Sequence, residues 1–214
     1  MPVKKVFWED PYLTEITAEI TSADKNIITL DKTVAYAFSG GQQSDSGTIG
    51  GYEILEAEKN GFEIYYTIPH GHSLHAGDPV AVKIDWEKRY KLMRLHFAAE
   101  IVLELVYTNF GRPEKTGANI TSEKARLDFV WDGNISETFP LLERRIKEIV
   151  SRDHDILSRF SDETAEIRYW EIEGFAKVPC GGTHLKKTGE VGGLKLKRIN
   201  PGGGRERIEI YLVN

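Results

Sequence analysis

The chain has 214 residues, of which 40% are hydrophobic and 29% are charged, a balance typical of a globular protein with one large or two small domains. No stretch approaches the roughly 18 consecutive apolar residues of a membrane span, and the first residues lack the apolar segment of a signal peptide. The single cysteine excludes an internal disulfide, and a net charge of −5 disfavours indiscriminate binding to nucleic acid. We therefore expect a cytoplasmic protein with no membrane association; the sequence does not indicate its oligomeric state.

The first eighty or so residues predict a small antiparallel β-barrel. Residues 13–38 alternate apolar and polar side chains in short runs that polar turns interrupt, as half-buried strands do. Residues 52–68 predict a hairpin that turns at Asn60-Gly61, because Asn-Gly is a strong hairpin signal. Residues 78–84 add one more strand. Many short strands joined by tight turns favour a barrel.

After the last of these strands, apolar residues begin to recur every three or four positions. This spacing predicts a helix over residues 87–109 with one apolar stripe, ended by Gly111 and Pro113. A second helix is predicted over residues 136–158, where Ser136 can cap the N-terminus and charges alternate in sign. Further strands are predicted at residues 124–131, 165–172 and 205–213.

Together these patterns predict an α+β protein with two domains. Residues 1–86 would form the small antiparallel β-barrel, which contains a Gly-rich segment. Residues 87–214 would form an α+β domain in which helices pack on an antiparallel sheet.

Four residues could form a metal site. The only cysteine, Cys180, stands four residues before His184 in the segment CGGTH, whose glycines would let the backbone curl so that thiolate and imidazole converge. His96 and Glu100 are spaced i, i+4 on the first helix and so share a face. His, Glu, Cys and His could supply four tetrahedral zinc ligands. Each residue also has an ordinary structural explanation: a core histidine, a buried thiol or a surface ion pair.

Two other segments stand out. His70, His72 and His75 lie in HGHSLH between predicted strands, and we interpret this segment as a loop that binds metal only adventitiously. Residues 37–51 contain five glycines. They form either a flexible barrel loop or a segment whose backbone N–H groups approach a phosphate or nucleotide closely. No G-K-[ST] follows, so this is not a P-loop.

Basic residues are concentrated between positions 186 and 207, which contain seven Lys and Arg but only two Glu. One interpretation is an edge strand that lysines protect from aggregation. The other is a strip that contacts nucleic-acid phosphates and therefore binds in a salt-dependent way. The residues of this strip are Lys186, Lys187, Lys195, Lys197 and Arg198.

Four segments carry a family resemblance: AFSGGQQSDSG, RLHFAAE, RLDF and CGGTHLKKTGEVG. In this order and spacing, they resemble the AlaX family of alanyl-tRNA editing proteins, in its medium-length form. These proteins are free-standing relatives of the editing domain of alanyl-tRNA synthetase and, more distantly, of threonyl-tRNA synthetase. The resemblance covers nearly the whole chain, so the domain at residues 87–214 would be the editing domain.

The resemblance implies a trans-editing deacylase. It would hydrolyse the ester of mischarged seryl-tRNA(Ala), and of glycyl-tRNA(Ala) in many members, and spare alanyl-tRNA(Ala). His96, Cys180 and His184 would hold zinc, which activates a water or orients the substrate. The family usually carries a second histidine where this chain has Glu100. A carboxylate there would make zinc a weaker Lewis acid; alternatively, Glu100 turns away and water takes its place. Either change affects metal affinity and activity more than fold.

The resemblance also implies roles for three further residues. Thr116 matches a polar position of the editing pocket and would contact the substrate serine or the attacking water. Gln42 and Asp45 would position the terminal adenosine of the tRNA or order the Gly-rich loop. One alternative stays open, a non-catalytic, zinc-stabilised tRNA-binding module. A zinc peptidase is disfavoured because H-E-x-x-H is missing, and a complete synthetase is excluded by length.

Overall fold

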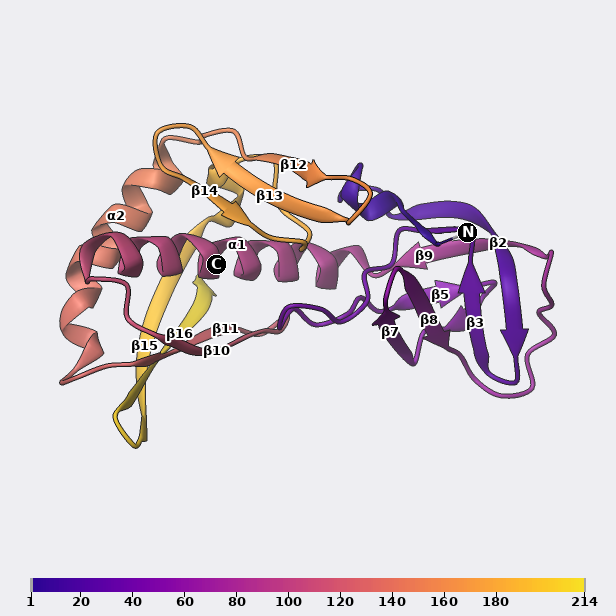
Figure 1. Ribbon diagram of the computed structural model, residues 1–214, viewed down its shortest axis with the longest axis horizontal. Helices are drawn as coiled ribbons and strands as arrows, with labels where there is room; N and C mark the ends of the chain where they lie inside the picture. The colour runs from indigo at the N-terminus through magenta and orange to yellow at the C-terminus, as the bar shows by residue number, and fades with distance from the viewer. Residues whose placement is uncertain (1, 214) are drawn as a thin grey trace. The chain divides into compact units, whose positions relative to one another are not determined.

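The computed structural model describes residues 2–213 and divides into two compact units, residues 1–90 and 91–214 (Figure 1). The fold is α+β, with mostly antiparallel sheets and two α-helices among the described residues. None of the helices described is long and apolar enough to cross a membrane.

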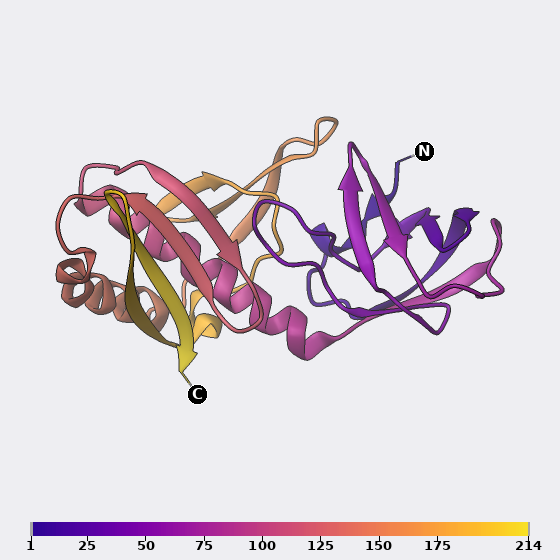
Figure 2. The same cartoon turned by 90° about the horizontal axis from the view of Figure 1, so that it is seen from below.

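The first unit is built on a seven-stranded antiparallel sheet in the order β6-β5-β9-β2-β3-β8-β7. The sheet curls and ends at β6 and β7, so the antiparallel strands that the sequence predicts form a half-barrel (Figure 2). The strands are β2 (Glu15–Asp24), β3 (Ile27–Leu30), β5 (Gly47–Ile49), β6 (Tyr52–Glu53), β7 (Glu56–Asn60), β8 (Glu63–Thr67) and β9 (Pro79–Ile84).

A smaller parallel pair and a short helix complete this unit. β1 (Lys4–Lys5) pairs with β4 (Lys32–Thr33), and the 3₁₀ helix η1 spans Val6–Trp8. The core beneath the curled sheet contains fully buried aliphatic side chains from several strands, among them Ile20, Ile28, Ile49, Ile64 and Val82.

The hairpin β7–β8 turns one residue later than the sequence predicts. Asn60 pairs with Glu63, so the two loop residues are Gly61 and Phe62. Gly61 has a φ of 59°, and glycine at the first loop position takes a positive φ without a steric penalty. The Asn-Gly signal therefore located the hairpin correctly but not its register.

The second unit places most of α1 (Trp86–Asn109) between two antiparallel sheets (Figures 1 and 2). The four-stranded sheet has the order β10-β11-β16-β15, and the three-stranded sheet has the order β12-β13-β14. The strands are β10 (Lys115–Ile120), β11 (Ala125–Val130), β12 (Leu157–Asp162), β13 (Ile167–Ile172), β14 (Ala176–Pro179), β15 (Gly193–Gly202) and β16 (Arg205–Val213).

Burial of α1 extends beyond the predicted stripe. Met93, Phe97, Ala98 and Ile101 lie outside that stripe and are also fully buried, because the helix is covered on more than one side. The predicted stripe consists of Leu92, Leu95, Ala99, Val102, Leu103 and Val106. On one side Phe97 contacts Trp170 of β13 edge-on, with ring centroids 5.1 Å apart. A helix that is apolar around most of its circumference is a core helix.

The second helix is shorter than predicted. The 3₁₀ helix η2 (Ile135–Thr138) precedes α2 (Phe139–Ser151), and β12 already begins at Leu157. The cap is Asn134, whose side chain accepts a hydrogen bond from the Ser136 amide at 3.1 Å. Two residues beyond α2, Asp153 has a φ of 50°, which is incompatible with continued helix. A third 3₁₀ helix, η3, spans Thr188–Val191.

Candidate metal-binding site

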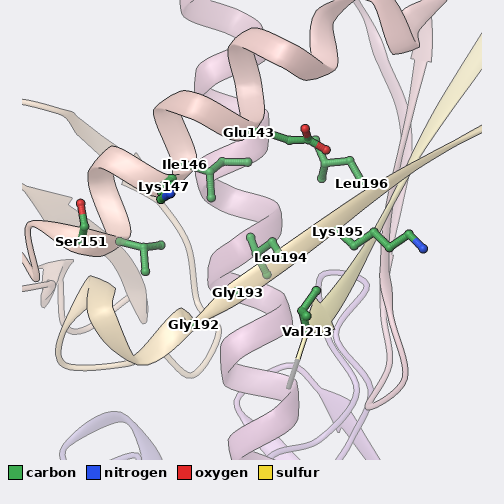
Figure 3. A pocket seen from close by; sticks show the side chains of 11 residues that line it. Glu143, Ile146, Lys147, Ser151, Gly192, Gly193, Leu194, Lys195, Leu196 and Val213 are labelled. Atoms are coloured by element: carbon green, nitrogen blue, oxygen red, sulfur yellow. The ribbon is translucent and has the colours of Figure 1, made fainter.

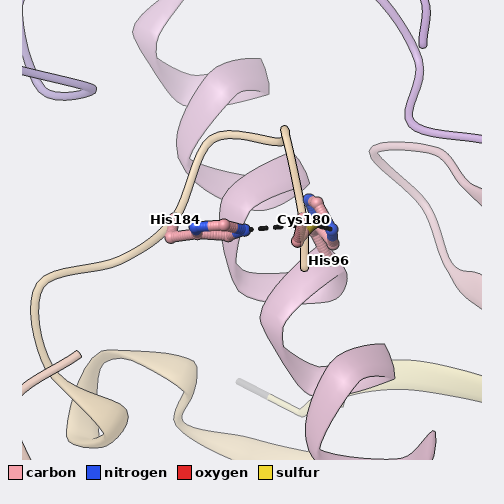
Figure 4. A group of neighbouring side chains, drawn as sticks. All are labelled: His96, Cys180 and His184. Atoms are coloured by element: carbon pink, nitrogen blue, oxygen red, sulfur yellow. Dashed lines mark hydrogen bonds between the residues drawn. The ribbon is translucent and has the colours of Figure 1, made fainter. Parts of the chain in front are cut away.

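Three side chains from distant parts of the second unit converge. His96 extends from α1, and Cys180 and His184 come from the loop that follows β14 (Figure 4). The Cys180 Sγ lies 3.4 Å from His96 Nε2 and 3.3 Å from His184 Nε2. One ligand atom of each residue lies within 4.8 Å of the other two. This cluster could hold a metal ion.

The loop that carries Cys180 is fixed by the neighbouring strand. The Cys180 amide donates to the carbonyl of Arg168 at 2.9 Å, and the guanidinium of Arg168 donates to the carbonyl of Gly182 at 3.2 Å. Neither Gly181 nor Gly182 has a positive φ. The turn therefore does not require glycine for a left-handed backbone conformation. The loop is held instead by the buried Arg168.

The two histidines differ in charge. Burial lowers the pKa of His96, but the negative charge and hydrogen bond of Cys180, reinforced by Glu100, raise it to about 10 overall. The pKa of His184 is held well below its ordinary value by burial and by the positive charges of His96 and Arg168. Without a metal, His96 is therefore cationic and His184 neutral. A metal ion must displace the proton of His96.

Ser158 of β12 orients His184. Its Oγ lies 2.9 Å from His184 Nδ1, so that Nε2 faces the cysteine. Such hydrogen bonds to the second ring nitrogen fix the tautomer and orientation of metal-binding histidines. Sequence reasoning did not identify Ser158, because the polar segment LSRFSD gives no clear strand signal.

Glu100 lies beside this cluster. Its Oε1 is 3.2 Å from His96 Nε2, but Glu100 is not one of the three residues whose ligand atoms all lie within 4.8 Å of one another. Burial raises the pKa of Glu100, but the hydrogen bond and charge of His96, with the nearby side chains of Cys180 and Trp170, lower it overall. Glu100 is thus an ionised carboxylate adjacent to the cluster.

Comparison with known proteins identifies the family. A family model described as "Threonyl and Alanyl tRNA synthetase second additional domain" matches residues 167–209. The chain is 32% identical to "Alanyl-tRNA editing protein AlaX-M" of Pyrococcus horikoshii over 98% of this chain and 97% of that protein. The chain belongs to the AlaX-M family. The protein of the same name from Methanosarcina acetivorans is 31% identical over 98% of both chains.

A longer protein shares the same region. "Alanine--tRNA ligase" of Ignicoccus hospitalis is 33% identical over 91% of this chain, which corresponds to 24% of the ligase. The AlaX-M chain therefore resembles one portion of that ligase.

Thr116, which the AlaX-M resemblance assigns to the pocket, lies on an exposed bulge of β10. Lys115 pairs with Phe129 and Gly117 with Asp128, so Thr116 is the extra residue between them. A bulge re-aims the side chain of its extra residue. Thr116 is not part of the His–Cys–His cluster.

Gln42 and Asp45 are buried in the first unit. The Asp45 carboxylate accepts a hydrogen bond from the Tyr36 amide at 2.7 Å and forms an ion pair with the fully buried Arg89. Arg89 also donates to the carbonyls of Pro11 and Val34, at 2.9 and 2.6 Å. These contacts hold the Gly-rich loop in place. They also engage the Asp45 carboxylate in bonds within the protein.

Among the basic residues near the C-terminus, Lys186, Lys187, Lys195 and Lys197 are exposed, and Arg198 is half-buried. Lys187 forms an ion pair with Asp155 at 3.1 Å, and Arg198 donates to Glu206 at 2.6 Å.

Lys195 also borders a groove of about 690 Å³ between α2 and β15 (Figure 3). The groove is lined by Ile146, Leu194 and Leu196, and Lys147 lies on its α2 side. Cationic side chains therefore adjoin an apolar surface in this unit.

The three histidines of HGHSLH do not form a metal cluster within residues 2–213. His72 is engaged by the backbone: Nε2 lies 2.6 Å from the carbonyl of Lys25, and Nδ1 accepts from the Leu74 amide at 3.2 Å. His75 lies 3.7 Å from Asp78. This segment behaves as an ordinary ordered loop.

Proposed function

We propose that this AlaX-M protein hydrolyses the ester of mischarged seryl-tRNA(Ala), and also of glycyl-tRNA(Ala), while it spares alanyl-tRNA(Ala). The main support is the His96–Cys180–His184 cluster, in which both histidines are buried, in a chain that matches alanyl-tRNA editing proteins along its length. A synthetase pocket for a small apolar side chain rejects an added hydroxyl poorly. A second site that hydrogen-bonds the hydroxyl can provide the missing discrimination.

Zinc is the metal that we propose for this cluster. Tetrahedral zinc with Zn–N of about 2.0–2.1 Å and Zn–S of about 2.3 Å would separate a sulfur and a nitrogen ligand by roughly 3.5 Å. The Sγ–Nε2 distances of 3.4 and 3.3 Å are close to this value. His96, Cys180 and His184 would hold the ion, and Glu100, the fourth ligand expected from the sequence, would lie beside it. Bound zinc would activate a water or orient the substrate.

The surrounding residues have distinct roles in this proposal. Ser158 keeps His184 in the orientation that exposes Nε2 to the metal. Glu100 adds a negative charge that moderates the Lewis acidity of zinc. Thr116 contacts the serine side chain of the substrate or the attacking water, from a bulge that exposes its hydroxyl. Residues 1–86 and 87–214 would act as separate domains, with hydrolysis confined to the second.

Binding of tRNA would use Lys186, Lys187, Lys195, Lys197 and Arg198 as phosphate contacts. Lys187 and Arg198 also form ion pairs with Asp155 and Glu206, so a phosphate would compete with these carboxylates. Each phosphate contact steepens the fall of affinity with salt. Gln42 and Asp45 would act by ordering the Gly-rich loop instead of touching the adenosine, since both are buried.

The deciding experiment measures deacylation of seryl-tRNA(Ala) and alanyl-tRNA(Ala) by the purified protein at a confirmed zinc content. We expect rapid loss of serine and retention of alanine. Thr116→Val should reduce the preference for serine without lowering folding stability. If zinc is bound and neither ester is hydrolysed, the protein is the alternative, a non-catalytic tRNA-binding module. The replacement of the family's usual histidine by Glu100 is the observation that favours this alternative.

A further inference from the structure

A groove of about 740 Å³ lies in the first unit, where β3, β7 and β8 meet the Gly-rich loop. Its lining combines exposed apolar residues with carboxylates, and it contains no residue of the proposed catalytic or tRNA-binding sites. The lining residues are Ile27, Phe38, Ser44, Glu56, Ala57, Glu58, Lys59, Asn60 and Tyr65.

Phe38 is the most exposed aromatic residue of this groove, with 56% of its surface accessible. Its backbone is nevertheless fixed: the Phe38 amide donates to the Ala57 carbonyl at 3.2 Å, and a bridge joins Phe38 to Glu58. On its C-terminal side, Ser39 and Gln42 bond each other across a tight turn. A large apolar side chain held in solvent by an ordered backbone is typical of an interaction surface.

A second aromatic ring and two carboxylates lie next to Phe38. Tyr65 is 40% exposed and is paired across the β7–β8 ladder with Glu58. Glu56 lies two residues earlier on the same strand, and it and Glu58 are both exposed. The one cation in the lining, Lys59, has its ammonium 5.5 Å from the ring centre of Trp8. Aromatic faces and carboxylates together attract cations.

The charge of the whole unit favours the same ligand. Residues 1–90 contain 14 Asp and Glu against 8 Lys and Arg, whereas residues 91–214 contain 19 against 20. An acidic unit repels the phosphates of nucleic acid and attracts a positively charged partner. In addition, β7 is the last strand of its sheet, and residue 38 pairs with its outer edge at Ala57 and Glu58, so Phe38 lies beside Glu58.

We propose that this groove is a docking site for a basic segment of a partner protein. A Lys or Arg side chain packs over Phe38 and Tyr65, and its charge is neutralised by Glu56 and Glu58. The proposal is independent of the deacylase activity.

The test uses the full-length protein and a fluorescein-labelled synthetic peptide, Lys-Phe-Arg-Lys-Phe-Arg, in fluorescence anisotropy at fixed salt. Phe38→Ala and Glu58→Gln should each weaken peptide binding by roughly 3- to 30-fold, the range of a cation–π or charged contact. Phe62→Ala is the matched control. Phe62 is 46% exposed but does not line the groove, so its removal should change affinity less than twofold.

A 12-nucleotide single-stranded RNA serves as the competing probe. Unfolding midpoints of the variants establish that each is folded. The proposal is overturned if the peptide does not bind, or if Phe38→Ala and Glu58→Gln leave its affinity unchanged. It is also overturned if the RNA binds and Phe38→Ala weakens the RNA more than the peptide, which would make the groove a nucleic-acid site.

Discussion

Two polar clusters, one in each unit, differ in what their atoms can bind. In the first unit, Arg89 is surrounded by the Asp45 carboxylate and two backbone carbonyls. In the second, Cys180 Sγ lies within hydrogen-bond distance of Nε2 of both His96 and His184, and all three atoms are potential metal ligands. Burial of polar groups alone therefore does not identify a functional site. The saturated Asp45–Arg89 cluster, in which charged groups and carbonyls bond one another, stabilises the fold, whereas side chains that converge with potential ligand atoms can bind a metal ion.

Removal of the thiolate should produce the largest effect. Cys180→Ser takes away the one soft ligand. Structural zinc binds with about 10–16 kcal/mol in all, so losing one of its few ligands should weaken zinc by roughly 10³-fold. Competition with a chromophoric chelator measures the change. Tight zinc binding by this variant would show that the metal lies elsewhere.

A substitution in the Asp45–Arg89 cluster should lower folding stability and leave metal binding unchanged. Asp45→Asn leaves Arg89 buried without its counter-charge, so the free energy of unfolding of the first unit should fall by about 3–5 kcal/mol. Urea denaturation measures this loss. Glu9→Gln is the control, because it breaks an exposed pair with Lys4, which is worth about 0–1 kcal/mol. Equal effects of the two substitutions would mean that the buried pair does not hold the loop.

An outer hydrogen bond should matter less than a ligand. Ser158→Ala removes the partner of His184 Nδ1, and zinc affinity should fall by about 10- to 100-fold. Ser161→Ala on the same strand is the matched control, since its hydroxyl donates only to the Ile167 carbonyl in the hydrogen bonds observed. If both variants bind zinc like the parent protein, Ser158 does not orient the ligand.

Glu100 should give the smallest change in zinc affinity. The carboxylate of Glu100 is not one of the three clustered ligand groups. Glu100→Gln should therefore lower zinc affinity by less than about 10-fold, the smallest loss typical of residues that hydrogen-bond to a metal ligand. The absorption spectrum of the cobalt-substituted protein gives a second readout of coordination. A loss as large as that of Cys180→Ser would make Glu100 a full ligand.

Local sequence patterns predicted several elements of this fold. The helix at residues 87–109, the strands at residues 124–131, 165–172 and 205–213, and the β7–β8 hairpin all have counterparts in the structure. The i, i+4 spacing and the CGGTH segment also picked out His96, Cys180 and His184, which lie together.

Features that depend on distant residues were not predictable in this way. The Asp45–Arg89 pair joins residues 44 positions apart, and nothing in either local segment signals it. β12 and β14 are short and lack clean alternation, and Ser158 gains its role only when β12 lies next to the loop of His184. The open edge of the first sheet likewise follows from strand pairing, which local periodicity does not specify.

The metal-site cysteine is the only thiol in the chain. Oxidation of Cys180 to a sulfenic acid would remove the thiolate ligand, and no second cysteine exists in this sequence to trap the product as an internal disulfide. Repair would then depend on an external thiol such as glutathione. Oxidative stress would then remove a ligand of the proposed zinc site and stop the proposed editing reaction, while the Asp45–Arg89 pair, which contains no sulfur, would be untouched.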